Sequence, residues 1–291
     1  MKKADEVQRF LFEHAPIRGE IVQLETSWQQ IIQGRNYPAI LQKLLGQFTA
    51  AAALLSSTIK FDGALILQAQ TDGPISLLVA EATSNRNIRA TAKWKTELLT
   101  DDLQKLFNGG KLVITISSKN GKEKYQGIVE LIGNKISTVL EHYMEKSEQL
   151  PTHVWLTANE KQASGLILQK IPGTEVDDVD MWNRIVQLAS TIKDEELLNL
   201  ASNEILHRLF HEETLRVFDP ERITFKCSCS REKVINTLRM LGYKEVHSII
   251  TEKEKIQVNC EYCNQEYVFD KVDAEQLFAS ATQEKTSQTK H

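Results

Sequence analysis

Apolar and polar residues alternate in short runs through most of the first 174 residues, and this period of two predicts β-strands. Within Glu6–Glu25 the runs VQRFLF and IVQLE are separated by Pro16 and Gly19. From Gly63 onward the runs ALILQAQ and ISLLVAEA flank the turn sequence Asp72-Gly73-Pro74. Further strands are predicted at Asn87–Trp94, Lys111–Ser117, Tyr125–Leu131, Val154–Thr157 and Leu166–Lys170.

Helical spacing interrupts these strands. The longest predicted helix, Tyr37–Ser57, has an alanine-rich middle, TAAAALL, that favours close packing against a sheet. Shorter helices are predicted over residues 26–33, 101–107 and 136–148. Thr26 or Ser27 would cap the first of them. Strands grouped in sequence with a few helices are typical of an α+β fold, so residues 1–174 are predicted to form a largely antiparallel α+β core domain.

The character of the chain changes near Gly173. Between Gly173 and Thr224 there are twelve acidic and five basic residues, in a chain whose total net charge is −4. Large apolar residues recur there with the spacing of several short amphipathic helices, broken around Lys193-Asp194 and Asp219-Pro220. Short helices are marginal in water unless their apolar faces dock onto something. The pattern predicts a helical linker over residues 175–224, with an ordinary helical subdomain as the alternative.

All four cysteines lie in the last quarter of the chain, Cys227 and Cys229 as C-x-C and Cys260 and Cys263 as C-x-x-C. Two close pairs of thiols suit one tetrahedral zinc ion. His247 is near in sequence, but four thiols already complete a tetrahedron. Spacing alone leaves open a permanently structural zinc site and a zinc site that doubles as a thiol switch. Structural disulfides are disfavoured in a long chain with no export signal.

Residues 225–281 are therefore predicted to form a zinc-binding domain. Two helices, Arg231–Leu241 and Lys244–Lys253, would span the gap between the cysteine pairs. Strands at Ile256–Asn259 and Tyr267–Phe269 would form a hairpin around the C-x-x-C. The polar end, residues 282–291, is predicted to be disordered.

Composition restricts the class of protein. Hydrophobic residues make up 41% and charged residues 25% of the 291 residues, as in ordinary globular proteins. The net charge of −4 argues against a nucleic-acid partner, because phosphate contacts require a surplus of Lys and Arg. The apolar run Phe48–Ile59 is too short to span a bilayer. With no targeting segment at the start, the expected location is the cytoplasm, where thiols are kept reduced.

Signatures of catalysis are missing from the sequence. It contains no Gly-rich phosphate loop and no nucleophile elbow. His14, His142 and His153 have no nucleophile in a known signature beside them, so they are expected to be solvated or hydrogen-bonded. Asp101 and Asp102 lie at a predicted helix start, where carboxylates favour the helix dipole. We expect no catalytic residues and no enzyme activity.

Several stretches of the chain resemble one known family. FKCSCSRE and CEYCNQEYVF resemble the zinc domain of the bacterial redox-regulated chaperones, the 33 kDa heat shock protein family. The stretches Lys60–Ala82, Arg18–Glu20 and Ala163–Pro172 resemble the amino-terminal domain of the same family. The matches fall in order over nearly the whole chain.

This resemblance implies a chaperone that holds unfolding client proteins without ATP and is switched by oxidation. In the reduced form Cys227, Cys229, Cys260 and Cys263 would hold one zinc ion per chain, and the protein would be an inactive monomer. Oxidation would release zinc and form the disulfides Cys227–Cys229 and Cys260–Cys263, as their closeness in sequence also favours. The active form would be a homodimer. The linker would uncover its apolar faces when the zinc domain is lost.

Two other functions remain open from the residues themselves. One is a constitutive zinc-stabilised adaptor or regulatory protein, in which the metal never leaves. The other is a thiol oxidoreductase using Cys260-Glu261-Tyr262-Cys263, although no thioredoxin-like context surrounds this motif.

Overall fold

The computed structural model describes residues 5–119, 123–172 and 180–278, and contacts between residues divide the chain into two compact units, Met1–Lys226 and Cys227–His291. We call them the N-terminal unit and the C-terminal unit. The predicted α+β class is confirmed, because both units combine helices with antiparallel strands. The predicted domain boundaries at residues 174, 224 and 281 stay predictions.

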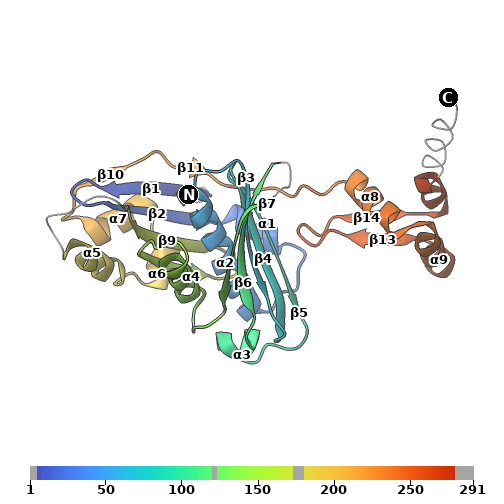
Figure 1. The fold of residues 1–291 in the computed structure, drawn as a ribbon, viewed down its shortest axis with the longest axis horizontal. Coiled ribbons are helices and arrows are strands. Elements are labelled where there is room, and N and C mark those ends of the chain that lie inside the picture. The colour runs from blue at the N-terminus through green and yellow to red at the C-terminus, as the bar shows by residue number, and fades with distance from the viewer. Residues whose placement is uncertain (1–4, 120–122, 173–179, 279–291) are drawn as a thin grey trace. The chain divides into compact units, whose positions relative to one another are not determined.

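Two sheets form the N-terminal unit (Figure 1). The first has the strand order β10-β1-β2-β9-β8, with β11 also paired to β1. Its strands are β1 (Glu6–Phe12), β2 (Ile17–Leu24), β8 (Thr152–Ala158), β9 (Ala163–Lys170), β10 (Leu215–Val217) and β11 (Glu221–Arg222). We call it the first sheet; all its pairings are antiparallel.

The second sheet has the strand order β12-β5-β4-β3-β6-β7. Its strands are β3 (Gly63–Gln70), β4 (Ile75–Thr83), β5 (Asn87–Trp94), β6 (Lys111–Ser118), β7 (Glu123–Glu130) and β12 (Thr224–Phe225). The short β12 pairs parallel to β5, and the remaining pairs are antiparallel. The strands predicted from alternation are therefore confirmed.

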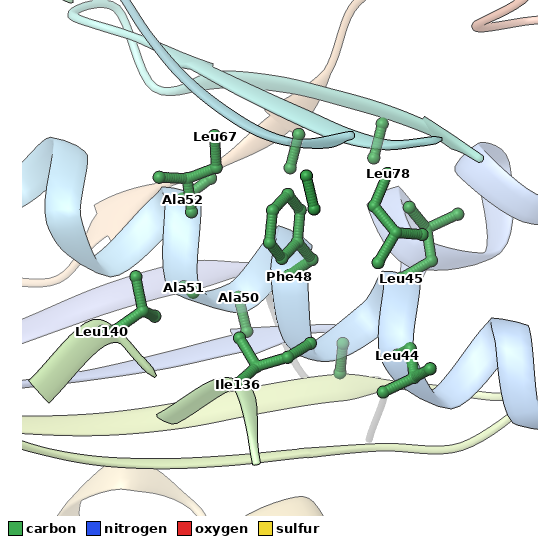
Figure 2. Packing of buried hydrophobic residues seen from close by; sticks show 14 of the residues in the cluster. Leu44, Leu45, Phe48, Ala50, Ala51, Ala52, Leu67, Leu78, Ile136 and Leu140 are labelled. Carbon is green, nitrogen blue, oxygen red and sulfur yellow. The ribbon is translucent and has the colours of Figure 1, made fainter. Parts of the chain in front are cut away.

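Helix α2 (Ala39–Thr58) lies between the two sheets and is the centre of the larger core. Phe48 and Leu45 point toward Leu78 of the second sheet, while Ala50 lies close to Ile136 of helix α4 (Ile136–Lys146) (Figure 2). The small side chains of its Ala50–Ala53 run let the helix approach the strands closely. In the described part of the chain, α2 alone is long and apolar enough to cross a membrane, but 72% of that stretch is buried in the protein. It is a core helix.

The N-terminal unit also contains two short helices, α1 (Thr26–Ile32) and α3 (Leu103–Phe107). Asp102 lies at the start of α3, as predicted, and caps it by accepting from Gln104 N–H at 3.0 Å. The predicted capping of α1 by Thr26 or Ser27 is wrong. The carboxylate of buried Asp5 instead accepts from the backbone N–H groups of residues 25, 26 and 27, at 2.6, 3.0 and 2.6 Å.

Three short helices pack on the outer face of the first sheet: α5 (Met181–Ala189), α6 (Asp194–Asn199) and α7 (Ser202–Phe210). Their buried apolar residues form a second core with Phe10, Phe12 and Ile21 of the sheet. The ring of Phe210 lies 5.1 Å from that of Phe12, edge to face. The amphipathic helices predicted for this part of the chain are therefore present, with the predicted break before Asp194.

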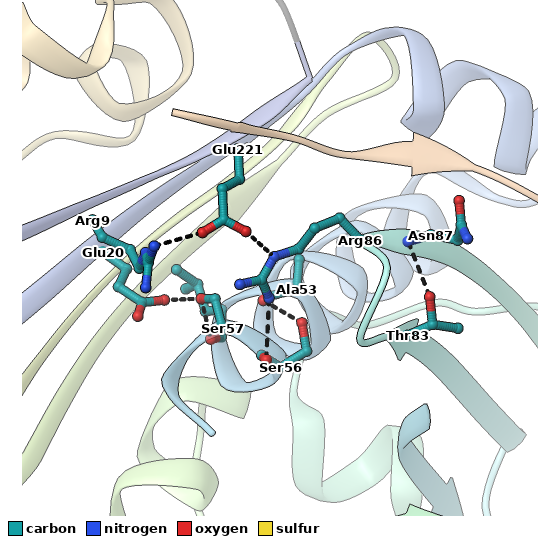
Figure 3. A network of polar contacts seen from close by, with 10 residues as sticks. Arg9, Glu20, Ala53, Ser56, Ser57, Thr83, Arg86, Asn87 and Glu221 are labelled. Carbon is teal, nitrogen blue, oxygen red and sulfur yellow. Dashed lines mark hydrogen bonds and ion pairs between the residues drawn. The ribbon is translucent and has the colours of Figure 1, made fainter. Parts of the chain in front are cut away.

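Residues 215–226, which we call the strap, are extended rather than helical. The strap pairs with β1 at the edge of the first sheet and with β5 at the edge of the second. Glu221 binds Arg9 and Arg86, each at 2.7 Å (Figure 3). At its end, Phe225 N–H donates to Ser27 Oγ at 2.9 Å and Lys226 N–H donates to the Ile88 carbonyl oxygen at 3.1 Å.

In the C-terminal unit the predicted elements are confirmed. Helices α8 (Arg231–Leu241) and α9 (Tyr243–Lys253) precede the hairpin of β13 (Ile256–Asn259) and β14 (Glu266–Phe269). Residues 271–278 are also helical. Among the described residues of this unit the core is small, with seven buried apolar residues: Leu238, Val246, Ile250, Ile256, Phe269, Ala274 and Leu277.

Candidate metal centre

The four cysteines are held by two short backbone segments of the C-terminal unit. Cys227 and Cys229 lie in the extended stretch that leads into α8, whose N-terminus is capped by Ser230, which accepts from Lys233 N–H at 3.3 Å. Cys260 and Cys263 lie in the turn between β13 and β14. Ser230 thus ends the C-x-C segment where the helix begins.

The turn of the C-x-x-C is closed by its own backbone. Cys260 N–H donates to the Gln265 carbonyl oxygen, and Asn264 N–H donates to the Cys260 carbonyl oxygen, both at 2.9 Å. Asn264 has φ +60°, a left-handed conformation that asparagine tolerates better than most residues. This tight loop places both sulfurs on one side of the hairpin, as a zinc knuckle requires.

The two segments bring all four sulfurs together. Cys227 Sγ lies 3.6 Å from Cys260 Sγ, and Cys229 Sγ lies 3.4 Å from Cys263 Sγ. All four Sγ atoms lie within 4.8 Å of one another. Four sulfurs about 2.3 Å from one zinc ion form a tetrahedron with edges of ~3.8 Å. The cluster therefore fits a tetrahedral metal ion held by four thiolates.

No histidine or carboxylate of the described residues joins this cluster. The ring of His247 stacks on Tyr243, with centroids 5.4 Å apart. His14, His142 and His153, considered above as catalytic bases, belong to no metal-binding group in the described part of the chain either. Glu141 lies 3.6 Å from His153 Nδ1, and Trp182 stacks on the same ring.

The thiols of the cluster differ in acidity. Burial raises the pKa of Cys260, but backbone N–H groups of Cys263 and Tyr262 and the neighbouring thiols outweigh it and lower the pKa to about 7. Burial and the neighbouring thiols raise the pKa of Cys263 to about 12, and burial raises that of Cys227. Without a cation the cluster resists full ionisation, since its negative charges would repel one another. A divalent metal would remove this penalty.

The basic side chains that flank the cysteines in sequence differ in what they contact. Lys233 Nζ donates to the Ser228 carbonyl oxygen at 2.6 Å, within the C-x-C loop. Arg231 instead pairs with Asp273 at 2.9 Å and lies over the ring of Phe269. Arg231 therefore ties α8 to the hairpin and the following helix.

Tyr267 is a neighbour of the cluster that the sequence pattern did not single out. Its hydroxyl donates to Cys229 Sγ at 3.2 Å, and this contact raises the pKa of Tyr267 to about 12. The spacing of Tyr267 four residues after Cys263, on the returning strand of a knuckle, is the only signal that pointed to it.

Comparison with known proteins gives full-length matches. The family model described as Hsp33 protein matches residues 5–270. A 33 kDa chaperonin of Nitrosococcus oceani is 46% identical over 291 residues, covering 100% of both chains. One of Methylobacillus flagellatus is 48% identical over 282 residues, covering 96% of both. The crystal structure of a 33 kDa chaperonin from Thermotoga maritima shares the fold, with a TM-score of 0.83 at 24% identity over 96% of this chain and 99% of the other.

Proposed function

The chain belongs to the Hsp33 protein family, and on that premise we propose that it is a redox-regulated chaperone that holds unfolding proteins without ATP. The observation that carries this proposal is the cluster of four thiols, all within 4.8 Å of one another, in a unit with a small core. In the reduced state Cys227, Cys229, Cys260 and Cys263 hold one zinc ion and the chaperone is inactive. It acts in the cytoplasm as a binding protein, with no turnover of its own.

The switch itself is the oxidation of the cysteines. When bound, zinc keeps all four sulfurs deprotonated, and the thiolate is the form that reacts. A peroxide or hypochlorous acid transfers an oxygen or chlorine to one thiolate, and a second thiol attacks that sulfur to form a disulfide, with water or chloride leaving. The pairs are Cys227–Cys229 and Cys260–Cys263, which are closest along the chain. Peptide mapping of the oxidised protein would identify them.

Loss of the metal removes most of the stability of the C-terminal unit. A structural zinc site contributes about 10–16 kcal/mol of apparent binding free energy. A whole domain is stable by only about 5–15 kcal/mol. A unit whose core has seven buried apolar residues therefore unfolds when its ligands are oxidised.

The linker turns this unfolding into client binding. Cys227 directly follows the strap, whose last backbone hydrogen bond is made by Lys226. Once the chain beyond residue 226 is mobile, the pairing of the strap with the two sheets is weakened. The packing of the short helices α5–α7 on the first sheet is weakened next. Their release exposes Leu206, Leu209 and the apolar face of the first sheet, flanked by the acidic linker. Such a surface binds unfolded chains, and a second copy of itself in a homodimer.

The test is metal content paired with chaperone activity in one preparation. Peroxide with mild heating should release about one zinc per chain and switch on suppression of client aggregation, and reductant with zinc should reverse both. If zinc stays bound in oxidant, or if client aggregation is suppressed equally before and after oxidation, the protein is instead a constitutive zinc-stabilised adaptor. Turnover of a disulfide substrate at low protein concentration would instead identify an oxidoreductase.

A linker variant should activate the chaperone without oxidant. Leu209 of α7 is 2% exposed against the first sheet, so Leu209→Asp buries a charge at a cost of about 3–5 kcal/mol. The docked helices should then be released, and the reduced, zinc-loaded variant should suppress aggregation. His207→Asp places the same carboxylate on the exposed face of α7 and should stay inactive. A silent Leu209→Asp variant would contradict the linker model.

A further inference from the structure

A pocket of about 230 Å³ opens between the two sheets of the N-terminal unit, far along the chain from the cysteines. Its walls come from the end of α2, from β3, β6 and β7, and from α4 and the loop after it. Most of these walls are apolar: Leu55, Ile59, Leu65, Ile114, Ile116, Met144 and Leu150. Ile59 and Tyr125 are 38% and 40% exposed, so the mouth of the pocket reaches solvent.

Arg18 is the one cation that lines this pocket, and it forms no ion pair with any described residue. Its Nε and Nη2 groups both donate to the same atom, Gln169 Oε1. A guanidinium has five N–H donors, so three are left without an acceptor among the described residues. No carboxylate in the described part of the chain lies within ion-pair distance of Arg18. Gln169 in turn donates to Thr152 Oγ1 at 2.9 Å, which holds it in place.

Two carboxyl groups lie near Arg18, Glu20 and Glu148, and neither forms an ion pair with it. Burial raises the pKa of Glu20, two residues along β2, to about 8, although Arg18, Arg86 and Arg9 oppose this shift, so at neutral pH this group is mostly uncharged. Glu148 lines the same pocket but makes no ion pair with Arg18, and its Oε1 is held by the hydroxyls of Tyr125 and Tyr143, which donate to it at 2.6 and 2.5 Å. Burial and the bond to Glu148 raise the pKa of Tyr143, so this phenol remains a donor.

We propose that this pocket binds a free medium-chain aliphatic carboxylate, with the carboxylate on Arg18 and the chain among the apolar walls. The planar guanidinium with unused N–H donors matches the two oxygens of a carboxylate. The volume also fits, because a cavity of about 150 Å³ already takes up benzene. Drug-sized ligands need pockets of about 300 Å³ or more. The pocket volume lies between these two values, which suits a short alkyl chain with one anionic end.

The experiment titrates the full-length, reduced, zinc-loaded protein with octanoate by calorimetry. Octanol, which has the same chain without the charge, and acetate, which has the charge without the chain, are the matched ligands. Octanoate should bind saturably at one site, about tenfold or more tightly than octanol, because a charge-assisted contact to a half-buried guanidinium is added. Acetate should give no saturable binding. The methyl resonance of Met144 should shift with octanoate.

Two variants locate the site. Arg18→Gln should remove the preference for octanoate over octanol, and Ile116→Trp, which fills the pocket from half-buried β6, should abolish binding of both. Lys105→Gln removes an equal charge from an exposed position on α3 and should bind as the original chain does. Three results would each overturn the proposal. Octanol could bind as tightly as octanoate, the Arg18→Gln variant could keep its preference for octanoate, or Ile116→Trp could leave octanoate binding unchanged. The absence of saturable octanoate binding would overturn it as well.

Discussion

Replacing Cys263 with serine is expected to leave the C-terminal unit without zinc and to unfold it. Cys263 Sγ lies 3.4 Å from Cys229 Sγ, so its loss opens the tetrahedron at one corner. The alcohol that replaces it is a far poorer ligand than a thiolate, and the small core cannot compensate for about 10–16 kcal/mol of metal binding. Zinc content measured on the purified variant should fall from about one per chain to nearly none.

Amide spectra show whether the loss is confined to one unit. Resonances of residues 227–278 should collapse to random-coil positions, while those of α2 and the strands around it stay dispersed. Val272→Ser places a serine at an exposed position of the same unit, 61% exposed, and should keep both its zinc and its spectrum. A Cys263→Ser protein that keeps a full complement of zinc would rule out the four-thiol site.

Replacing Glu20 with glutamine is expected to stabilise the N-terminal unit, most of all at alkaline pH. Glu20 is 3% exposed on β2, and burial raises its pKa from the ordinary value of 4.5 to about 8. Arg18, Arg86 and Arg9 pull the pKa down and Glu221 raises it, but the loss of hydration is the largest effect. Arg9 and Arg86 are themselves bound to Glu221, so they compensate Glu20 only in part (Figure 3).

Local hydrogen bonding agrees with a protonated Glu20. The Ser57 hydroxyl contacts both Glu20 Oε2 and the Leu54 carbonyl oxygen, the latter at 2.8 Å. A hydroxyl carries one proton and can also accept, so a protonated Glu20 can donate to Ser57 Oγ and leave the serine proton for the Leu54 carbonyl oxygen. Glutamine keeps a donor and an acceptor at this position without any charge.

The sign of the pH dependence follows from the raised pKa. Between pH 4.5 and about 8 the folded state holds a proton that the unfolded state has lost, so the free energy of unfolding decreases as pH rises through this window. The full difference is of the order of 5 kcal/mol. Glu20→Gln should remove this dependence, so urea unfolding at pH 9 should give a variant more stable than the original chain by a few kcal/mol, and by much less at pH 5. The control Glu145→Gln, at an exposed position on α4, should have the same free energy of unfolding as the original chain at both pH values. If Glu20→Gln also matched the original chain at both, Glu20 would be ionised in the folded protein without cost, which contradicts the prediction.

Much of the fold could be predicted because its signals are local. A side chain's neighbours two residues away on a strand, or three and four away on a helix, decide which face is apolar, and these periods are visible without any structure. Alternation located the longer strands of both sheets, and the alanine run of α2 predicted a helix that packs closely. The spacing of the four cysteines likewise predicted a cluster able to hold a metal, since each pair needs only a short loop.

The tertiary structure alone decided which distant groups meet. Asp5 caps α1 across 20 residues of chain, where the local pattern pointed to Thr26 or Ser27. The strap pairs with both sheets, although its alternating pieces, Leu215–Val217 and Ile223–Phe225, are too short to mark strands in the sequence. Sulfurs of the two cysteine pairs, about thirty residues apart along the chain, lie only 3.6 and 3.4 Å from each other.

The tertiary structure also decided that Glu20 is buried and that Arg18 forms no ion pair among the described residues. Both residues lie on β2 and read as ordinary polar positions of a strand. Their properties come from what packs over them, which is the sum of many weak contacts between elements far apart in sequence. The sequence pattern therefore determined the longer elements and the cysteine cluster that can hold a metal. The desolvation and pairing of individual charges were set only when those elements packed together.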